Sequence, residues 1–556
     1  MSPTQHEGLQ FEAHDTRARL QATCQLLATQ YGYPNEWYPD RWRVKQTEVG
    51  LQIAICTETG GAILVGIIVV RQVPNALTIL KHALEEEAIC SYGILIQDQQ
   101  ITAYRYRSKN SDLVSINQLE AYKLSKQSPR PLTYTRTENA TKCDGLTLEP
   151  LSGTVESVFF EAHSHIRDID GLHADEALDE LCKVLYAKLH DEETTLPNHP
   201  FKAQYSVYGN TAELSTSFRE LYQHANEYDN RVYSLRIPGY KRSRGVFDEP
   251  IRLSAPALSR VVEEFQRYDI SASALDVKGR AFQKTFLPAL RAGMGQYFTP
   301  HNVVQLIVES VNPNASHLVL DPFCGSGHFL TQTLEFVRNH SQRKLADDFA
   351  YHKLHGIEKS ERMVRVAMTD MRLHGDGHAN IRCTDALLPF SNYHDVEKES
   401  FDLVLTNPPF GSVLSVEAMN SIGRFELAKK GRKTALELLG LERSLQFLRP
   451  NGLLAIVLPE SIFVNSSTRY VREWLRSKAH IRAIVSLPIE TFSPFGANIK
   501  TSILFCRKRH RSSAGSPPVF LGIVENIGYD AAGRRLAGTD CEELARKLGE
   551  TLHSEV

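Results

Sequence analysis

The stretch that decides the fold is His317-Leu-Val-Leu-Asp321-Pro-Phe-Cys-Gly325-Ser-Gly327-His-Phe-Leu330. Its apolar start predicts a buried strand, the glycines predict a turn, and the residues after Gly327 predict a helix. Glycine at 325 and 327 lets the backbone approach a ligand where a Cβ atom would clash, although a tight turn without a ligand fits the same residues. No Gly-Lys-Ser/Thr follows, which excludes a P-loop.

Around this loop, from about residue 291 to 510, apolar strand candidates alternate with helical segments. The strand candidates are 317–321, 354–358, 401–407, 452–459, 481–488 and 500–507. Helical patterns fit between most of them, for example at 328–340 and 435–448. This alternation predicts an α/β fold with a doubly wound parallel sheet. The last two strands leave little room for a helix, so we expect them to form an antiparallel hairpin at the edge of the sheet.

The rest of the chain divides into three further regions by its pattern of strand-like and helical segments. Residues 1–145 read as an α/β accessory domain, with a buried strand at 61–70, a helix at 76–88 and a hairpin at 92–106. Residues 146–290 read as a helical domain, with helices at 177–190 and 258–268 and a loop at 232–250. Residues 511–556 read as a short C-terminal tail. A chain of 556 residues is too long for a single core, in keeping with several domains.

Composition narrows the class of protein. The formal net charge is −2 with 42% hydrophobic residues, which excludes a disordered chain and a polycation that coats nucleic acid. We expect no membrane span, because no apolar run approaches about 20 residues, and the N-terminus lacks a signal-peptide core. The nine cysteines form no CxxC pair, so neither a metal site nor a disulfide framework is expected. These features predict a reduced, cytoplasmic, soluble protein.

Two further acids follow the next strand candidates. Glu358 ends the strand at 354–358, where an acid can bind ribose hydroxyls. Asp385 follows the run from Asn380, where a carboxylate could accept the exocyclic amine of an adenine ring. Each acid alone fits a solvated or capping residue as well. Their occurrence together, in order, at strand ends favours a nucleoside-binding edge.

The most informative segment is Phe401-Asp-Leu-Val-Leu-Thr-Asn407-Pro408-Pro409-Phe410. The prolines end the strand and stiffen the turn, which frees the Asn407 side chain and the Pro408 carbonyl to act as acceptors. Two acceptors could hold the protons of an exocyclic amine and aim its lone pair at an electrophile. Phe410 could stack on a flipped base. A strand ended by a rigid loop is the alternative interpretation.

These two motifs in this order resemble the S-adenosylmethionine-dependent methyltransferases that act on N6 of adenine in DNA. The resemblance extends to the methylation subunits of type I restriction-modification systems over roughly residues 170–540. It rests further on 276–282 and Gly295-Gln-Tyr-Phe-Thr-Pro300 upstream, and on 448–459, 484–488 with Phe492, 501–505 and Ile527-Gly-Tyr-Asp530 downstream. It implies a Rossmann-like methyltransferase sheet over 291–510.

The resemblance also implies roles for particular residues. The residues implied to bind the cofactor are Asp321, Gly325 and Gly327 at its methionine end, Glu358 at the ribose, Asp385 at the adenine amine, and Tyr297, Phe298, Thr299 and Pro300 closing the pocket. Asn407, Pro408, Pro409 and Phe410 are implied to hold the target base and catalyse transfer. The family usually has a small residue at Phe323 and a glycine at His328, so cofactor packing is expected to differ here.

Residues 30–125 weakly resemble the N-terminal nuclease-like domain of type I restriction subunits. That domain carries an acid-x-Lys pair at the end of a buried strand, whereas this chain reads Ile67-Ile-Val-Val-Arg71 there. The carboxylate ligands of a Mg²⁺-dependent nuclease are therefore absent from that position. The region is interpreted either as a degenerate nuclease fold serving as a scaffold, or as an unrelated accessory domain.

Partners are predicted from charge and from length. Lys429, Lys430, Arg432 and Lys433 lie soon after Phe410 and could contact DNA phosphates, although a solvated helix start fits equally. The tail is too short for a target-recognition domain, so the resemblance implies double-stranded DNA, a specificity subunit in trans and a possible restriction subunit. Open alternatives are an N4-cytosine, RNA or protein amino-methyltransferase, and a silent cofactor-binding scaffold. Recognition by the N-terminal domain is the alternative to a separate subunit.

Overall fold

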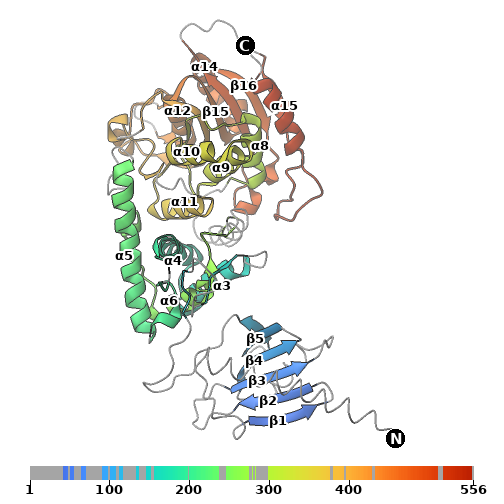
Figure 1. The fold of residues 1–556 in the computed structure, drawn as a ribbon. Coiled ribbons are helices and arrows are strands. Elements are labelled where there is room, and N and C mark those ends of the chain that lie inside the picture. The colour runs from blue at the N-terminus through green and yellow to red at the C-terminus, as the bar shows by residue number, and fades with distance from the viewer. Residues whose placement is uncertain are drawn as a thin grey trace. The chain divides into compact units, whose positions relative to one another are not determined.

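The computed structural model divides the chain into two compact units, which are described separately (Figure 1). The first is Met1–Thr133 with Asp144–Leu146, and the second is Tyr134–Cys143 with Thr147–Val556. The structure describes six strands between residues 42 and 116, and residues 133–136, 146–151, 156–197, 199–208, 210–236, 246–273, 279, 282, 299–375, 380–393, 396–428, 433–510 and 518–553. The four-domain division proposed from the sequence stays a prediction.

The first unit contains a six-stranded sheet in the order β1-β2-β3-β4-β5-β6. The strands are β1 (Trp42–Thr47), β2 (Gly50–Ile55), β3 (Leu64–Val70), β4 (Cys90–Gln97), β5 (Gln100–Arg107) and β6 (Asp112–Ile116). Strands β4 and β5 pair antiparallel from Gln97 and Gln100 outward, which confirms the predicted hairpin. Only the β3–β4 pair is parallel among these six strands. The predicted helix at 76–88 lies outside the described residues, and the nuclease resemblance stays a prediction.

Helices dominate the start of the second unit. They are α3 (Glu156–Asp170), α4 (Ala174–Thr194), α5 (Thr211–Arg236) and α6 (Ala255–Phe265). The predicted helix at 177–190 lies within α4. The loop predicted from residue 232 was placed too early, because α5 continues to Arg236. The helix predicted at 258–268 ends earlier, because Tyr268 pairs with Glu149 in the short β7–β8 sheet.

The second unit also holds an eight-stranded sheet in the order β11-β10-β9-β12-β15-β17-β16-β18. Its strands are β9 (Val319–Asp321), β10 (Leu354–Glu358), β11 (Ile381–Cys383), β12 (Phe401–Thr406), β15 (Leu448–Pro459), β16 (Ala479–Ser486), β17 (Thr501–Lys508) and β18 (Phe520–Ile523). Strand β17 runs antiparallel to β15 and β16, and every other neighbouring pair is parallel. The doubly wound sheet is confirmed.

Helices cover both faces of this sheet (Figure 1). One face packs on α8 (His301–Val311), α9 (His328–His340), α10 (Arg343–His352), α11 (Glu361–Leu373) and α15 (Cys541–His553). The other face packs on α12 (Leu436–Phe447) and α14 (Arg469–Lys478). Alternate residues of β15 serve the two cores: Leu453 and Ala455 face the first, and Leu454 and Ile456 the second. This period of two fits a strand buried on both faces.

The sequence misplaced the sheet edge. The two last predicted strands do pair antiparallel, but β17 lies inside the sheet between β15 and β16. The edge is β18, which adds parallel to β16 and comes from the segment expected to be a tail. Helix α15 follows and packs on α8. The boundary expected at residue 510 therefore does not mark the end of the sheet.

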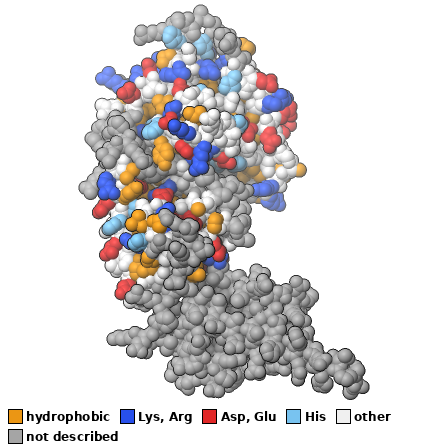
Figure 2. Space-filling view, in the orientation of Figure 1, with side chains coloured by type: hydrophobic (Ala, Val, Ile, Leu, Met, Phe, Trp, Pro, Cys, Tyr) orange, Lys and Arg blue, Asp and Glu red, His pale blue; other side chains and the backbone are white. Residues whose placement is uncertain are grey.

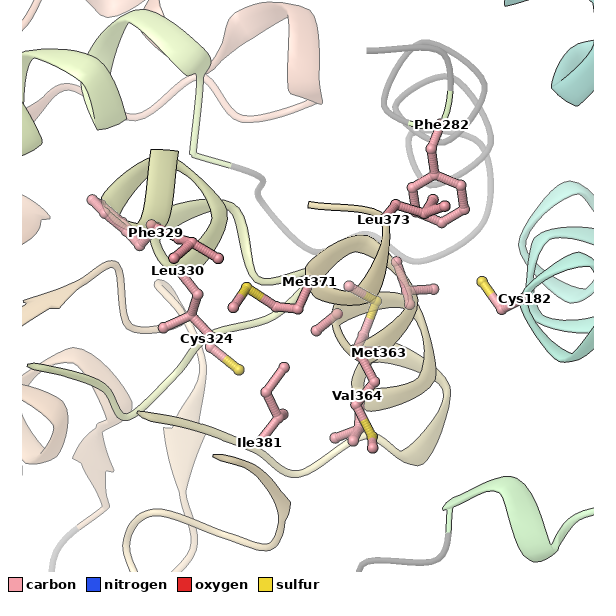
Figure 3. Close-up of a cluster of buried hydrophobic side chains, with 14 of the residues drawn as sticks. Cys182, Phe282, Cys324, Phe329, Leu330, Met363, Val364, Met371, Leu373 and Ile381 are labelled. Carbon is pink, nitrogen blue, oxygen red and sulfur yellow. The ribbon is translucent and has the colours of Figure 1, made fainter. Parts of the chain in front are cut away.

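Helix α11 lies between the glycine-loop helix α9 and helix α4. Figure 3 shows Met371 and Val364 of α11 on the side of Leu330 and Ile381, while Cys182 of α4 faces α11 from the other side. A buried ion pair crosses the α4 contact, where Arg365 Nε and Nη2 donate to Asp179 Oδ1 at 2.6 Å and Oδ2 at 2.9 Å. This ion pair therefore joins the helical region to α11, a helix that packs on the sheet.

Candidate active site

The predicted polar residues lie at the carboxyl ends of four parallel strands of the sheet. Strands β9 and β10 end at Asp321 and Glu358, Asp385 follows β11, and Asn407 follows β12. These four strands are adjacent and parallel, so their carboxyl ends share an edge. The chain runs outward from β9 to β11 and then crosses to β12 on the opposite side of β9. The crevice at such a switch point is where α/β sheets bind ligands.

The glycine loop is fixed by Glu358 from the neighbouring strand. Gly325 donates its backbone N–H to Glu358 Oε2 at 3.1 Å, and Ser360 donates its own to Oε1 at 2.8 Å. Burial raises the pKa of Glu358 above its ordinary value. Gly325 has a φ of +50° and Gly327 a φ of +84°, a region that favours glycine. A Cβ atom on Gly325 would meet no atom within 4 Å, which leaves open space over the loop.

Asp321 joins the two strands that flank the switch point. Its Oδ1 accepts from the Thr406 hydroxyl at 2.6 Å and from the Phe323 backbone N–H at 3.0 Å. Burial raises the pKa of Asp321 to about 7, and the negative charge of Glu358 adds to that increase. Sequence reasoning missed Thr406. The signal available was a polar residue ending the apolar run before Asn407.

Asp385 occupies a more open position. Its Oδ1 accepts from the Leu387 backbone N–H at 2.9 Å, and its Oδ2 pairs with Lys359 at the same distance. Lys359 is largely exposed, so this pair is accessible to solvent. The Tyr393 hydroxyl donates to the Asp385 backbone carbonyl at 2.8 Å. The carboxylate therefore lies at the rim of the crevice, where a hydrogen-bond donor of a ligand could displace Lys359.

The side-chain amide of Asn407 has a hydrogen-bonded nitrogen and an oxygen without a hydrogen-bond partner among the described residues. Its Nδ2 donates to Thr299 Oγ1 at 2.9 Å, whereas its Oδ1 is buried without a hydrogen-bond partner among the described residues. An unpaired buried acceptor costs free energy, so it marks a place where a donor is expected to bind. The prolines and Thr299 fix this acceptor at the switch-point edge.

The remaining motif residues pack around Asn407. Pro408 lies against α12, where a Cβ atom on Gly440 would come within 2.7 Å of it, and Pro409 is exposed. Phe410 is only 5% exposed and meets Phe492 edge to face at 5.9 Å. Its predicted stacking on a flipped base stays a prediction. The Tyr529 hydroxyl donates to the Thr491 carbonyl at 2.8 Å, which places the Ile527–Asp530 motif beside Phe492.

Some predicted residues fall outside the described part of the chain. These are Tyr297, Phe298, Lys429, Lys430 and Arg432. Pro300 is buried and caps α8, and Lys433 is exposed just before β14 (Thr434–Ala435). On the face in Figure 2, positive and negative side chains are interspersed over the described residues. We find no group of three or more His, Cys, Asp or Glu placed to hold a metal within the described ranges, and no helix there long and apolar enough to cross a membrane.

Comparison with known proteins places the predicted site within one matched segment. Residues 281–548 match the family model described as N-6 DNA Methylase. This segment, just under half of the chain, is similar to that family. The matched segment contains the glycine loop, Glu358, Asp385 and the Asn407 motif, and it extends through β18 and most of α15.

Curated relatives of this chain share somewhat over a quarter of its residues in the matched part. The EcoEI type I methylase subunit of Escherichia coli is 28% identical over 257 residues, which are 45% of this chain and 50% of the relative. The EcoKI type I methylase subunit of Escherichia coli strain K12 is 29% identical over 231 residues, 39% of this chain and 41% of the relative. The chain thus spans about half the length, or less, of these relatives.

Solved structures confirm the fold. A chain from a type I restriction-modification system covers 72% of this chain and 83% of its own length, with a TM-score of 0.53 and 19% identity. A modification subunit of a putative type I restriction enzyme from Vibrio vulnificus YJ016 covers 73% and 92%, with a TM-score of 0.52 and 18% identity. The Rossmann-like methyltransferase architecture is therefore shared with these structures.

Proposed function

We propose that this chain transfers a methyl group from S-adenosylmethionine to N6 of adenine in double-stranded DNA. It would act as the modification subunit of a type I-like restriction-modification or defence system. The observation that carries the proposal is the buried, unpaired Oδ1 of Asn407 at the switch-point edge of the sheet. The match to the N-6 DNA methylase family and the names of the type I relatives support the same reaction.

The residues present fit the cofactor. The open space over Gly325 leaves room for a ligand, and the Glu358 carboxylate can accept two hydroxyls on lone pairs that its backbone donors leave free. Asp321 and Gly327 would line the methionine end, Asp385 would hold the adenine amine, and Thr299 and Pro300 would close the pocket with Tyr297 and Phe298. S-adenosylmethionine supplies an electrophilic methyl group on a sulfonium.

The chemistry of this chain is orientation of the target amine. Asn407 Oδ1 and the Pro408 carbonyl accept the two N–H bonds of the adenine amine, which aims the nitrogen lone pair along the line of attack. The nitrogen would gain the methyl group as the methyl–sulfur bond of the sulfonium breaks, the sulfur would leave as a neutral thioether, and the nitrogen would then release one proton. Catalysis by positioning and by aligned dipoles accounts for such a transfer, and it requires no covalent enzyme intermediate.

Partners follow from the same proposal. Double-stranded DNA is the substrate, a specificity subunit selects the sequence, and a restriction subunit could complete the complex. Lys433 with Lys429, Lys430 and Arg432 would contact phosphates beside the base pocket. The near-neutral charge of the chain favours recognition shared with a partner. The cytoplasmic location expected from the sequence stays a prediction.

A chemical readout tests the function and separates the alternatives. The purified chain is incubated with duplex DNA and S-adenosylmethionine, with and without a specificity subunit, and the digested nucleosides are identified by mass spectrometry. We expect N6-methyldeoxyadenosine. N4-methyldeoxycytidine would establish the cytosine reaction instead, transfer to RNA or protein alone would establish those substrates, and intact cofactor binding without any transfer would indicate a silent scaffold.

A further inference from the structure

The hydrogen bond between Asn407 and Thr299 joins two segments that are distant in sequence. Asn407 follows β12, and Thr299 immediately precedes the capping residue of α8. The Nδ2···Oγ1 distance is 2.9 Å, a normal length for an N–H···O bond. The donor nitrogen and the acceptor oxygen of a carboxamide lie in one plane, on either side of the bond that joins the group to the side chain. Holding the donor end therefore also holds the acceptor end.

This contact changes what Oδ1 can do. The side chain of Asn407 can rotate about its terminal bond, because such a torsion is broad and weakly restrained. A bond from Nδ2 to Thr299 restricts that rotation and keeps Oδ1 in the buried position where no described residue donates to it. Donation from Nδ2 also polarises the amide, which strengthens Oδ1 as an acceptor. Both effects favour acceptance by Oδ1 of a hydrogen bond from the target amine.

Thr299 is itself held by the helix that follows the glycine loop. The side chain of His328, the first residue of α9, lies beside the backbone of Thr299. Its Nε2 also lies 3.3 Å from Nδ1 of His301, at the start of α8. The backbone carbonyl of Pro300 accepts the N–H groups of Val303 and Val304 at 3.0 and 3.1 Å. Contacts with α8 and α9 thus hold the backbone that carries the Thr299 hydroxyl.

We propose that Thr299 is a positioning residue for methyl transfer, which holds the Asn407 carboxamide with its oxygen toward the target amine. The inference rests on the proposed function and deepens it. A residue that only closed the cofactor pocket would act on cofactor affinity. Substitution of a residue that acts through Asn407 would lower the rate of methyl transfer, and only in a chain that still carries Asn407.

The test is a double-mutant cycle. Single-turnover transfer to duplex DNA, with a specificity subunit supplied, is measured for Thr299→Val, Asn407→Ala and the double variant. Calorimetry gives the affinity of each for S-adenosylmethionine. Valine keeps the shape of threonine but cannot accept a hydrogen bond. Thr299→Ser keeps the hydroxyl, and Thr216→Val on the exposed face of α5 is the matched control.

We expect Thr299→Val to lower the transfer rate about tenfold, the rate equivalent of one neutral hydrogen bond, a loss larger than any change in cofactor affinity. Serine should restore most of that rate, and Thr216→Val should behave as the wild type. In the Asn407→Ala background, Thr299→Val should have no further effect.

Three results would overturn the inference: transfer by Thr299→Val at the wild-type rate, an equal loss in both backgrounds, or a loss explained by cofactor affinity. Each of these leaves the proposed function intact. Absence of transfer by the wild-type chain with its specificity subunit would overturn both.

Discussion

The hydroxyl of Thr406 donates to Asp321 Oδ1 across 2.6 Å, although the two residues are 85 positions apart in the chain. The bond ties the end of β12 to the end of β9, the two strands that border the crevice. It holds a carboxyl group whose burial raises its pKa to about 7. The protonation of this group therefore changes near neutral pH.

Asp321→Asn is expected to change how stability depends on pH. A folded-state pKa above the ordinary value of 3.8 means that the folded protein binds the proton more tightly than the unfolded chain. The resulting stability is fully present below pH 3.8 and is lost as pH rises through about 7. Asparagine keeps an acceptor but carries no charge. The melting temperature of the variant minus that of the wild type should rise from about pH 5 to about pH 8. Asp347→Asn, on α10, is the control, and a constant difference for Asp321→Asn would contradict the prediction.

Asn407→Ala should lose methyl transfer and keep cofactor affinity, because its oxygen acts on the target amine. A loss of about 3 kcal/mol in transition-state stabilisation corresponds to a few-hundredfold in rate, within the range for removing one catalytic hydrogen bond. Single-turnover rates and calorimetry measure the two quantities. Asn465→Ala, at an exposed position, serves as the control. Transfer near the wild-type rate by Asn407→Ala would exclude the proposed role.

Gly325→Val should weaken binding of S-adenosylmethionine at least tenfold, because the branched side chain would enter the open space over the loop. Gly171 offers a matched control, since its φ is +68° and its Cβ position also meets no atom within 4 Å. Valine strains the backbone similarly at both positions. Calorimetry in the absence of metal should show a loss only for Gly325→Val. Equal affinities for the two folded variants would remove the loop from the cofactor site.

Arg365→Met should destabilise the second unit by about 3–5 kcal/mol, because the buried carboxylate of Asp179 loses its hydrogen-bonded guanidinium partner and keeps only Lys183 at 3.9 Å. Adding Asp179→Asn should recover a large part of that loss. Denaturant unfolding monitored by circular dichroism measures both. Arg546→Ala removes an exposed pair with Glu550 on α15 and should change stability by less than about 1 kcal/mol. An equal effect of Arg365→Met and Arg546→Ala would show that the buried pair contributes little.

Neutralising Lys429, Lys430, Arg432 and Lys433 to glutamine should weaken DNA binding by the isolated chain. It should also reduce the slope of log affinity against log salt by roughly 0.9 for each phosphate that the variant no longer neutralises. Fluorescence anisotropy over a salt series measures that slope. The same change at Arg546 and Lys547 of α15 is the control. An unchanged slope would exclude this segment from the DNA interface.

The fold was largely predictable because each parallel strand and its helix are local patterns. The helix predicted at 328–340 coincides with α9, and the strand predicted at 354–358 coincides with β10. Strand order is not a local property, so nothing in residues 501–508 showed that β17 inserts between β15 and β16. Strand β18 has only four residues, too few to display a period. The contacts of Thr406 and Thr299 were equally hidden, because each joins residues more than 80 positions apart.

The packing of α15 on α8 has a practical consequence for shortening the chain. A version truncated at residue 510 would keep every strand predicted from the sequence, but it would uncover the face of α8 on which α15 packs and the backbone edge of β16. Exposed apolar side chains beside an unpaired strand favour aggregation. Helix α8 begins two residues after Thr299, so its loosening would reach the residues proposed to act in methyl transfer. The smallest version expected to stay folded and active therefore retains α15 through His553.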